Sequence, residues 1–86
     1  MISSGQVAIG TVATAIDGVH PNPSRITIQN LDNSDTMYLG GTAVTTTSGL
    51  GLLKLETIQF DLEPLEQLYA VSTKAGHTIS WLRQTI

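Results

Sequence analysis

Regular alternation of apolar and polar residues in short segments constrains the fold of this chain most. Residues 57–62 are the clearest case, because Ile58, Phe60 and Leu62 occupy one face of an extended strand and polar residues occupy the other. Residues 25–29 repeat the pattern with Ile26 and Ile28 on the inner face. Both segments predict half-buried β-strands with one solvated face.

Turn-forming residues separate such segments at roughly ten-residue intervals, and no segment shows a convincing helical pattern. We expect residues 6–16 to form one strand, or two strands broken at Gly10. Asp17-Gly18 and Lys74-Ala75-Gly76 are turn signals. We therefore predict an all-β fold, a small antiparallel β-sandwich or barrel of about 7–8 short strands. We expect residues 1–5 to form a flexible N-terminal arm and residues 6–86 to form a single β domain.

Size and composition favour a chain that associates with others. The chain has 86 residues and no cysteine, so neither a disulfide nor a thiolate metal site can support its small core. We therefore expect a homo-oligomer. Its net charge is −3 with only four Lys and Arg residues, which argues against a nucleic-acid partner. The low content of charged residues suits a partner-covered surface, but equally an ordinary Thr/Ser-rich β domain.

No motif of enzymatic or metal chemistry is present. Asp61, Glu63 and Glu66 lie close in sequence, but an acidic, solvated strand edge explains them without catalysis. The Asn/Asp-rich residues 30–35 lack the glycine and glutamate of a calcium loop, and we expect them to join two strands of a hairpin. We expect no catalytic residue, no cofactor, no metal and no enzymatic activity. No apolar run approaches the ~18 residues of a membrane span, so we expect no membrane partner.

The stretch from Thr36 to Leu62 organises the chain. After a short apolar strand it turns at Gly40 and Gly41, crosses a Thr/Gly-rich segment and enters the alternating strand. We predict Gly40 and Gly41 to be a structural turn, and substitution by valine would test whether the pair needs positive φ. We predict an interaction loop between Gly41 and Leu55, with Leu52 or Leu53 against a neighbouring subunit or shell. Its candidate residues are Gly41, Val44, Leu50, Leu52, Leu53 and Leu55. The alternative is that Leu52 and Leu55 fix this loop to the core.

The order of these features resembles the small head decoration, or minor capsid, proteins of tailed bacteriophages. The matching residues are Tyr38-Leu39-Gly40-Gly41, Val44-Thr45-Thr46-Thr47 with Gly49, Asp61-Leu62 and Glu66-Gln67-Leu68-Tyr69-Ala70-Val71. The resemblance extends over about three quarters of the chain. One departure is Leu53-Lys54-Leu55-Glu56, where the family pattern would have a Pro/Gly-type turn.

The resemblance implies a non-enzymatic virion structural protein, made in the host cytoplasm. It would be a capsid decoration (cement) or minor capsid protein that binds the major capsid protein on the outside of the phage head, as a homotrimer. A phage tail or fibre-associated module is the first alternative. A carbohydrate-binding domain that uses Tyr38 or Tyr69 and a small hydrolase that uses Asp61 are the others.

Overall fold

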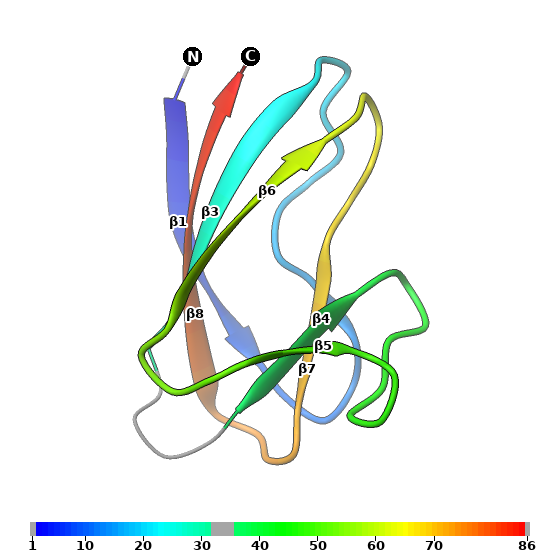
Figure 1. The fold of residues 1–86 in the computed structure, drawn as a ribbon, viewed down its shortest axis with the longest axis vertical. Coiled ribbons are helices and arrows are strands. Elements are labelled where there is room, and N and C mark those ends of the chain that lie inside the picture. The colour runs from blue at the N-terminus through cyan, green and yellow to red at the C-terminus, as the bar shows by residue number, and fades with distance from the viewer. Residues whose placement is uncertain (1, 32–35, 86) are drawn as a thin grey trace.

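The computed structural model describes residues 2–31 and 36–85, which form eight strands in two antiparallel four-stranded sheets (Figure 1). The long sheet has the order β1-β8-β3-β6. Its strands are β1 (Ile2–Ile9), β8 (His77–Thr85), β3 (Ser24–Asn30) and β6 (Thr57–Leu62). The short sheet has the order β2-β7-β4-β5. Its strands are β2 (Thr14–Ala15), β7 (Tyr69–Ser72), β4 (Met37–Gly40) and β5 (Leu50–Leu52). The predicted small all-β sandwich is confirmed.

The eight strands pair in a nested order, the first with the last and so on inward, as in one long antiparallel hairpin that is folded into two sheets. We call this the rolled hairpin. β1 pairs with β8, β2 with β7, β3 with β6 and β4 with β5, and all four pairs are antiparallel. Two further pairs, β3 with β8 and β4 with β7, complete the sheets. This is the jelly-roll arrangement of a β-sandwich. The loop between β4 and β5 is therefore the tip of the rolled hairpin.

Two expectations about connections are corrected. Residues 2–5 are not a flexible arm, because they form the first half of β1 and pair with β8 from Ile2↔Gln84 to Gly5↔Trp81. The start of β1 and the end of β8 therefore lie side by side (Figure 1). The strands on either side of residues 30–35 do not form a hairpin, because β3 belongs to the long sheet and β4 to the short one. Residues 32–35 lie outside the described residues.

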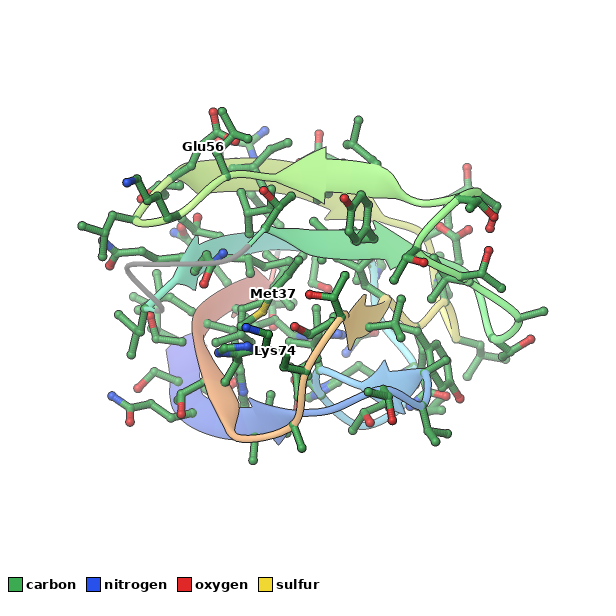
Figure 2. All side chains as sticks on the ribbon, turned by 90° about the horizontal axis from the view of Figure 1, so that it is seen from below. Met37, Glu56 and Lys74 are labelled. Atoms are coloured by element: carbon green, nitrogen blue, oxygen red, sulfur yellow. The ribbon has the colours of Figure 1, made fainter. Side chains whose placement is uncertain are left out.

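The core fills the space between the inner faces of the two sheets. Figure 2 shows Met37 of β4 within the interior. The fully buried apolar side chains come from both sheets, namely Ile9, Ile26, Ile28, Met37, Leu52, Ala70 and Ile79. The alternation predicted for residues 25–29 is present, with Ile26 and Ile28 buried and Arg25 exposed. Buried Asn30 adds a polar link between the sheets, since its Nδ2 donates to the carbonyl of Leu52 at 3.2 Å.

A glycine of β1 makes room for the single tryptophan. Trp81 of β8 is half-buried and packs against the core from the long sheet. A Cβ atom at Gly5, its register partner on β1, would lie 3.0 Å from Cζ2 of the indole. This distance is tighter than nine in ten contacts of real Cβ atoms, so a larger residue at Gly5 would require the indole of Trp81 to shift by a few tenths of an ångström.

One end of the sandwich is closed by a buried ion pair. Arg83 of β8 is 3% exposed, and its Nε lies 3.0 Å from Oδ2 of Asp17, which follows β2. The geometry between Nε of Arg83 and Oδ2 of Asp17 is that of an ion pair and not of a hydrogen bond. A second nitrogen of Arg83, Nη1, donates a hydrogen bond to Oγ of Ser24 at 3.2 Å. His20 Nε2 also lies 3.0 Å from Asp17 Oδ2. Asp17 therefore compensates a buried guanidinium charge.

The same end holds the connection between β6 and β7 in place. Gln67 donates from Nε2 to the carbonyl of Asp17 at 3.0 Å. The carbonyl of His20 accepts a hydrogen bond from the backbone N–H of Leu65 at 2.8 Å. The segment from Asp17 to His20 thus fixes the turn that carries Leu65.

Asp17→Ala should lower the free energy of unfolding by about 3–5 kcal/mol, because it leaves Arg83 buried without its counter-charge. For a small domain this is enough to unfold much of the protein. Urea denaturation followed by Trp81 fluorescence measures the change. The matched control is the double variant Asp17→Ala with Arg83→Leu, which removes both charges and should recover much of the loss. A loss below about 1 kcal/mol for Asp17→Ala would contradict this role of the pair.

Candidate interaction site

The loop at the tip of the rolled hairpin, residues 41–49, is closed by its own hydrogen bonds. The N–H of Val44 donates to the carbonyl of Gly41 at 3.1 Å. The carbonyl of Thr45 accepts from the N–H groups of Ser48 and Gly49, at 3.2 and 3.0 Å, and the N–H of Thr45 donates to Oγ of Ser48 at 3.0 Å. The loop is therefore a defined turn built from small polar residues.

Val44 anchors this loop. Its side chain is buried, beneath a shallow, open depression of about 380 Å³ lined by Gly40–Val44 and Ser48. The lining offers one serine hydroxyl, one threonine hydroxyl and small apolar groups, and no titratable side chain. Because specific small-molecule sites combine an enclosed apolar cavity with convergent polar groups, this depression does not resemble one.

β4 ends at Gly40 and a turn begins at Gly41, as predicted, but positive φ is not the reason for the two glycines. Neither has a positive φ, and Gly76 is the described glycine that does. A Cβ atom on Gly40 would lie 2.8 Å from Cγ2 of Val44, whereas a Cβ atom on Gly41 would meet nothing within 4 Å. The turn therefore needs Gly40 because Val44 packs closely against it, and it places no such demand on Gly41.

The predicted interaction residues divide into two groups. Val44 and Leu52 are buried and pack inside the molecule, so neither is available to a neighbouring subunit or shell. Leu50, Leu53 and Leu55 are 51%, 58% and 55% exposed. The alternative prediction is that Leu52 and Leu55 fix this loop to the core. It is correct for Leu52, which is buried, and wrong for Leu55, which is exposed.

The exposed leucines of this region lie along one side of the sandwich. β5 is an edge strand of the short sheet and β6 is an edge strand of the long sheet, and residues 53–56 join them directly (Figure 1). Leu50, Leu53 and Leu55 belong to β5 and this connection. Leu65, in the turn that follows β6, is 67% exposed and was not among the predicted residues. We call these four leucines and β6 the β5–β6 side.

The two turns that flank β6 have the same construction. In each, the N–H of the fourth residue donates to the carbonyl of the first, from Glu56 to Leu53 at 3.0 Å and from Glu66 to Glu63 at 3.1 Å. The glutamate side chain then accepts the N–H of the first residue, at 3.1 Å in the first turn and 2.6 Å in the second. Glu56 lies at the periphery of the molecule in Figure 2.

Both turns hold an exposed leucine in a strained conformation. Leu55 has φ 59° and Leu65 has φ 69°, in the third position of each turn, where glycine is usual. A side chain other than glycine costs about 1–2 kcal/mol in this conformation. Neither leucine recovers that cost by burial in the chain itself, since more than half of each is exposed. The residues at which the family pattern would have a Pro/Gly-type turn thus form such a turn, with leucine at the position of glycine.

The carboxylates of Asp61 and Glu66 both have structural partners. Asp61 accepts from Nε of Arg25 at 2.8 Å on the outer face of the long sheet, and this hydrogen bond lowers the pKa of the Asp61 carboxyl. The contribution of the pair to stability is therefore present above the ordinary carboxyl pKa and is lost as the pH falls through the lowered one. Glu66 accepts the N–H of Glu63 in the second turn.

Residues 2–31 and 36–85 contain no group of three His, Asp or Glu side chains placed to hold a metal ion. Asp32, Asn33 and Asp35, the other members of the Asn/Asp-rich segment, lie outside these ranges. The same ranges contain no helix that is long and apolar enough to cross a membrane.

Comparison of the chain with protein-family models, with curated proteins and with solved structures found no match.

Gly40→Ala should lower the free energy of unfolding by about 1–3 kcal/mol, because its Cβ would overlap Val44. Gly41→Ala is the matched control and should change stability by less than about 0.5 kcal/mol, because its Cβ would project into open space. Thermal or urea unfolding of the two variants measures the difference. Equal losses at both positions would show that the turn needs the conformational freedom of glycine instead.

Leu55→Gly and Leu65→Gly should each raise the free energy of unfolding by roughly 0.5–1 kcal/mol. Relief of the strain at positive φ exceeds the extra chain entropy that glycine loses on folding. Leu53→Gly is the matched control, because Leu53 is equally exposed without positive φ and should lose stability. Urea denaturation compares the three variants. Destabilisation by all three substitutions would mean that the side-chain contacts of Leu55 and Leu65 stabilise the protein by more than their positive φ destabilises it.

Proposed function

We propose that this chain is a non-enzymatic virion structural protein, a decoration or minor capsid protein that docks on the outside of a tailed-phage head. The observation that carries the proposal is the pair of exposed, strained leucines at the two ends of β6. Backbone strain persists where the surrounding structure maintains it, and it gathers at functional sites. Leucine offers a ligand little except apolar contact, so the function it serves here is adhesion to another protein surface.

The fold is compatible with this role without selecting it. Jelly rolls occur in viral capsid proteins and also in lectins, so the topology alone does not decide between them. A carbohydrate site would need aromatic rings free to stack, and Tyr38 and Tyr69 are both half-buried. Exposed leucines on the β5–β6 side favour a protein partner over a sugar.

The remaining surface suits a protein that decorates a shell. The outer face of the long sheet carries mainly Ser, Thr and Gln side chains, with Arg25 and Asp61 as its ion pair. Such a neutral face remains exposed to solvent when the β5–β6 side binds the major capsid protein. The resemblance to phage decoration proteins, over about three quarters of the chain, implies the same partner and a homotrimer on the shell.

Purified protein should co-sediment with phage heads that lack it, and Leu53→Ser with Leu55→Ser should reduce that binding at least tenfold. The loss follows from removing two exposed apolar side chains, each worth about 1.5–3 kcal/mol when fully buried. Cosedimentation followed by quantitative gel analysis measures binding, and circular dichroism checks that the variant is folded.

The matched control is Val12→Ser. Val12 is 75% exposed on the connection between β1 and β2, the edge strands of the opposite side, so the variant should bind normally. Equal weakening by both variants would reject the β5–β6 side as the docking surface. Absence of wild-type binding to heads, together with binding to tails, would move the protein to the tail.

A further inference from the structure

β6 presents a free strand edge with a regular pattern of backbone groups. It is the last strand of the long sheet, and its pairing with β3 is regular from Ser24↔Leu62 to Gln29↔Thr57. The N–H of Asn30 donates to the carbonyl of Glu56 at 3.0 Å, and these residues continue the same register. Glu56 is therefore a hydrogen-bonded position that faces β3.

In an antiparallel ladder, every second residue directs its backbone N–H and C=O groups to the same neighbouring strand. This rule gives the direction of the backbone groups of each residue in β6. Ile58, Phe60 and Leu62 direct their N–H and C=O groups to β3, as Glu56 does. Thr57, Gln59 and Asp61 direct theirs to the free edge. The side chains of these three residues lie on the exposed outer face of the long sheet.

This pattern limits how a second copy of β6 can pair with the first. In an antiparallel pair, each residue whose backbone groups face the partner strand lies opposite another such residue. The edge-facing residues of β6 are every second residue, so the twofold axis relating two copies must lie at a residue position and not midway between two positions. The central candidates are Gln59 and Phe60. A centre at Phe60 pairs Gln59 with Asp61 of the partner subunit, and both positions have edge-facing groups.

A twofold axis at Phe60 also brings complementary side chains of the two copies together at both ends of β6. Leu55 and Leu65 each lie five residues from Phe60, and Lys54 and Glu66 each lie six residues from it. The first turn of one copy therefore meets the second turn of the other. Exposed leucine approaches exposed leucine there, and the lysine approaches a glutamate of opposite charge.

The alternative centre matches poorly. A centre at Gln59 would place Leu55 opposite Glu63 of the partner subunit and Lys54 opposite Pro64 of the partner subunit. One apolar match would remain, since Leu53 would lie opposite Leu65 of the partner subunit, but the charged match and the contact between the two strained leucines would be lost. Backbone pairing occurs in either register, and a centre at Phe60 leaves Thr57 opposite Glu63 of the partner subunit, whose N–H and C=O are already bonded within the second turn. The selection of Phe60 therefore rests on the charged contact and on the pairing of the strained leucines.

We propose that β6 pairs antiparallel with β6 of a second copy of this chain, about a twofold axis through Phe60, and joins two long sheets into one. Half-buried Ile58 and Phe60 then gain cover from Leu62 and Phe60 of the partner subunit. The two strained leucines gain contacts that the single chain does not give them. The contact is isologous, since each surface binds its own copy.

This inference goes beyond the docking proposed above and does not depend on a capsid. The twofold contact uses β6, Leu55 and Leu65, which the proposed docking also uses, so one subunit cannot make both contacts at the same time. The paired form is therefore the form of the free protein, and docking on a shell would replace it. A threefold contact between copies would use a different surface of the protein.

Cysteine crosslinking tests the register, because the natural chain has no cysteine. Gln59 and Asp61 of the partner subunit would form a hydrogen-bonded pair with Cα atoms about 5.5 Å apart, which suits a disulfide. The full-length double variant Gln59→Cys with Asp61→Cys should become mainly covalent dimer on mild oxidation. Non-reducing gel electrophoresis measures the product.

The two single variants are the matched controls. With the axis at Phe60, each single cysteine lies two residues out of register with its own copy, beyond disulfide reach, so both variants should remain uncrosslinked. Crosslinking by Gln59→Cys alone would move the axis to Gln59, and by Asp61→Cys alone to Asp61. Either result, or no dimer from the double variant, would overturn the proposal.

Gln59→Pro provides a test that needs no cysteine. Proline removes the edge-facing N–H of Gln59, which has no partner strand within one chain and is the kind of position where an edge strand tolerates proline. Sedimentation analysis should show loss of the twofold contact, with the circular dichroism spectrum unchanged. Gln59→Ala keeps the N–H and should associate as the wild type does. A wild-type mass for folded Gln59→Pro would overturn the proposal.

Discussion

The buried charge of Arg83 is the constraint on which the rest of the structure depends. A guanidinium that is 3% exposed requires a counter-charge, and Asp17 supplies it from the connection between β2 and β3. Once that connection is fixed, His20 and Asp17 bind Leu65 and Gln67 through their backbone carbonyls. A single ion pair thereby links β8 to both long connections at one end of the sandwich. It also sets the position of the second turn beside β6.

The rolled-hairpin pairing determines which strand edges the described chain leaves unpaired. Each sheet keeps two edges, and β5 and β6 place one edge of each sheet on the same side because a short turn joins them. β2 and β5 are short, which limits their value as pairing edges, whereas β6 is regular and six residues long. The turns at its ends hold leucines that the isolated chain stabilises poorly. At Leu55 and Leu65 the positive φ lowers the stability of the single chain, whereas the exposed side chains would strengthen the association that we propose.

Much of the candidate site follows from the sequence, and the missing part has a clear physical cause. Leu53 and Leu55 stood out because leucines are dense in an otherwise polar segment, and both are exposed. Leu52 belongs to the same dense segment but enters the core, because β5 pairs with β4 and directs it inward opposite Met37. Leu65 resembles an ordinary turn residue in sequence. Its importance comes from a backbone conformation and from its position relative to Phe60.

The sequence by itself determined the class of the fold, because strand alternation and turn residues are local properties of the chain. It predicted the inner positions of β3 and β6, and a break at Gly10 was one of its two interpretations of residues 6–16. Tertiary structure alone decided which strands pair, since β4 with β5 is the one pair of consecutive strands among those the structure describes. It also decided that Gly40 is needed for Val44, that residues 2–5 are part of a strand, and that Arg83 is buried against Asp17. These are contacts between residues brought together by folding, and local pattern contains no information about them.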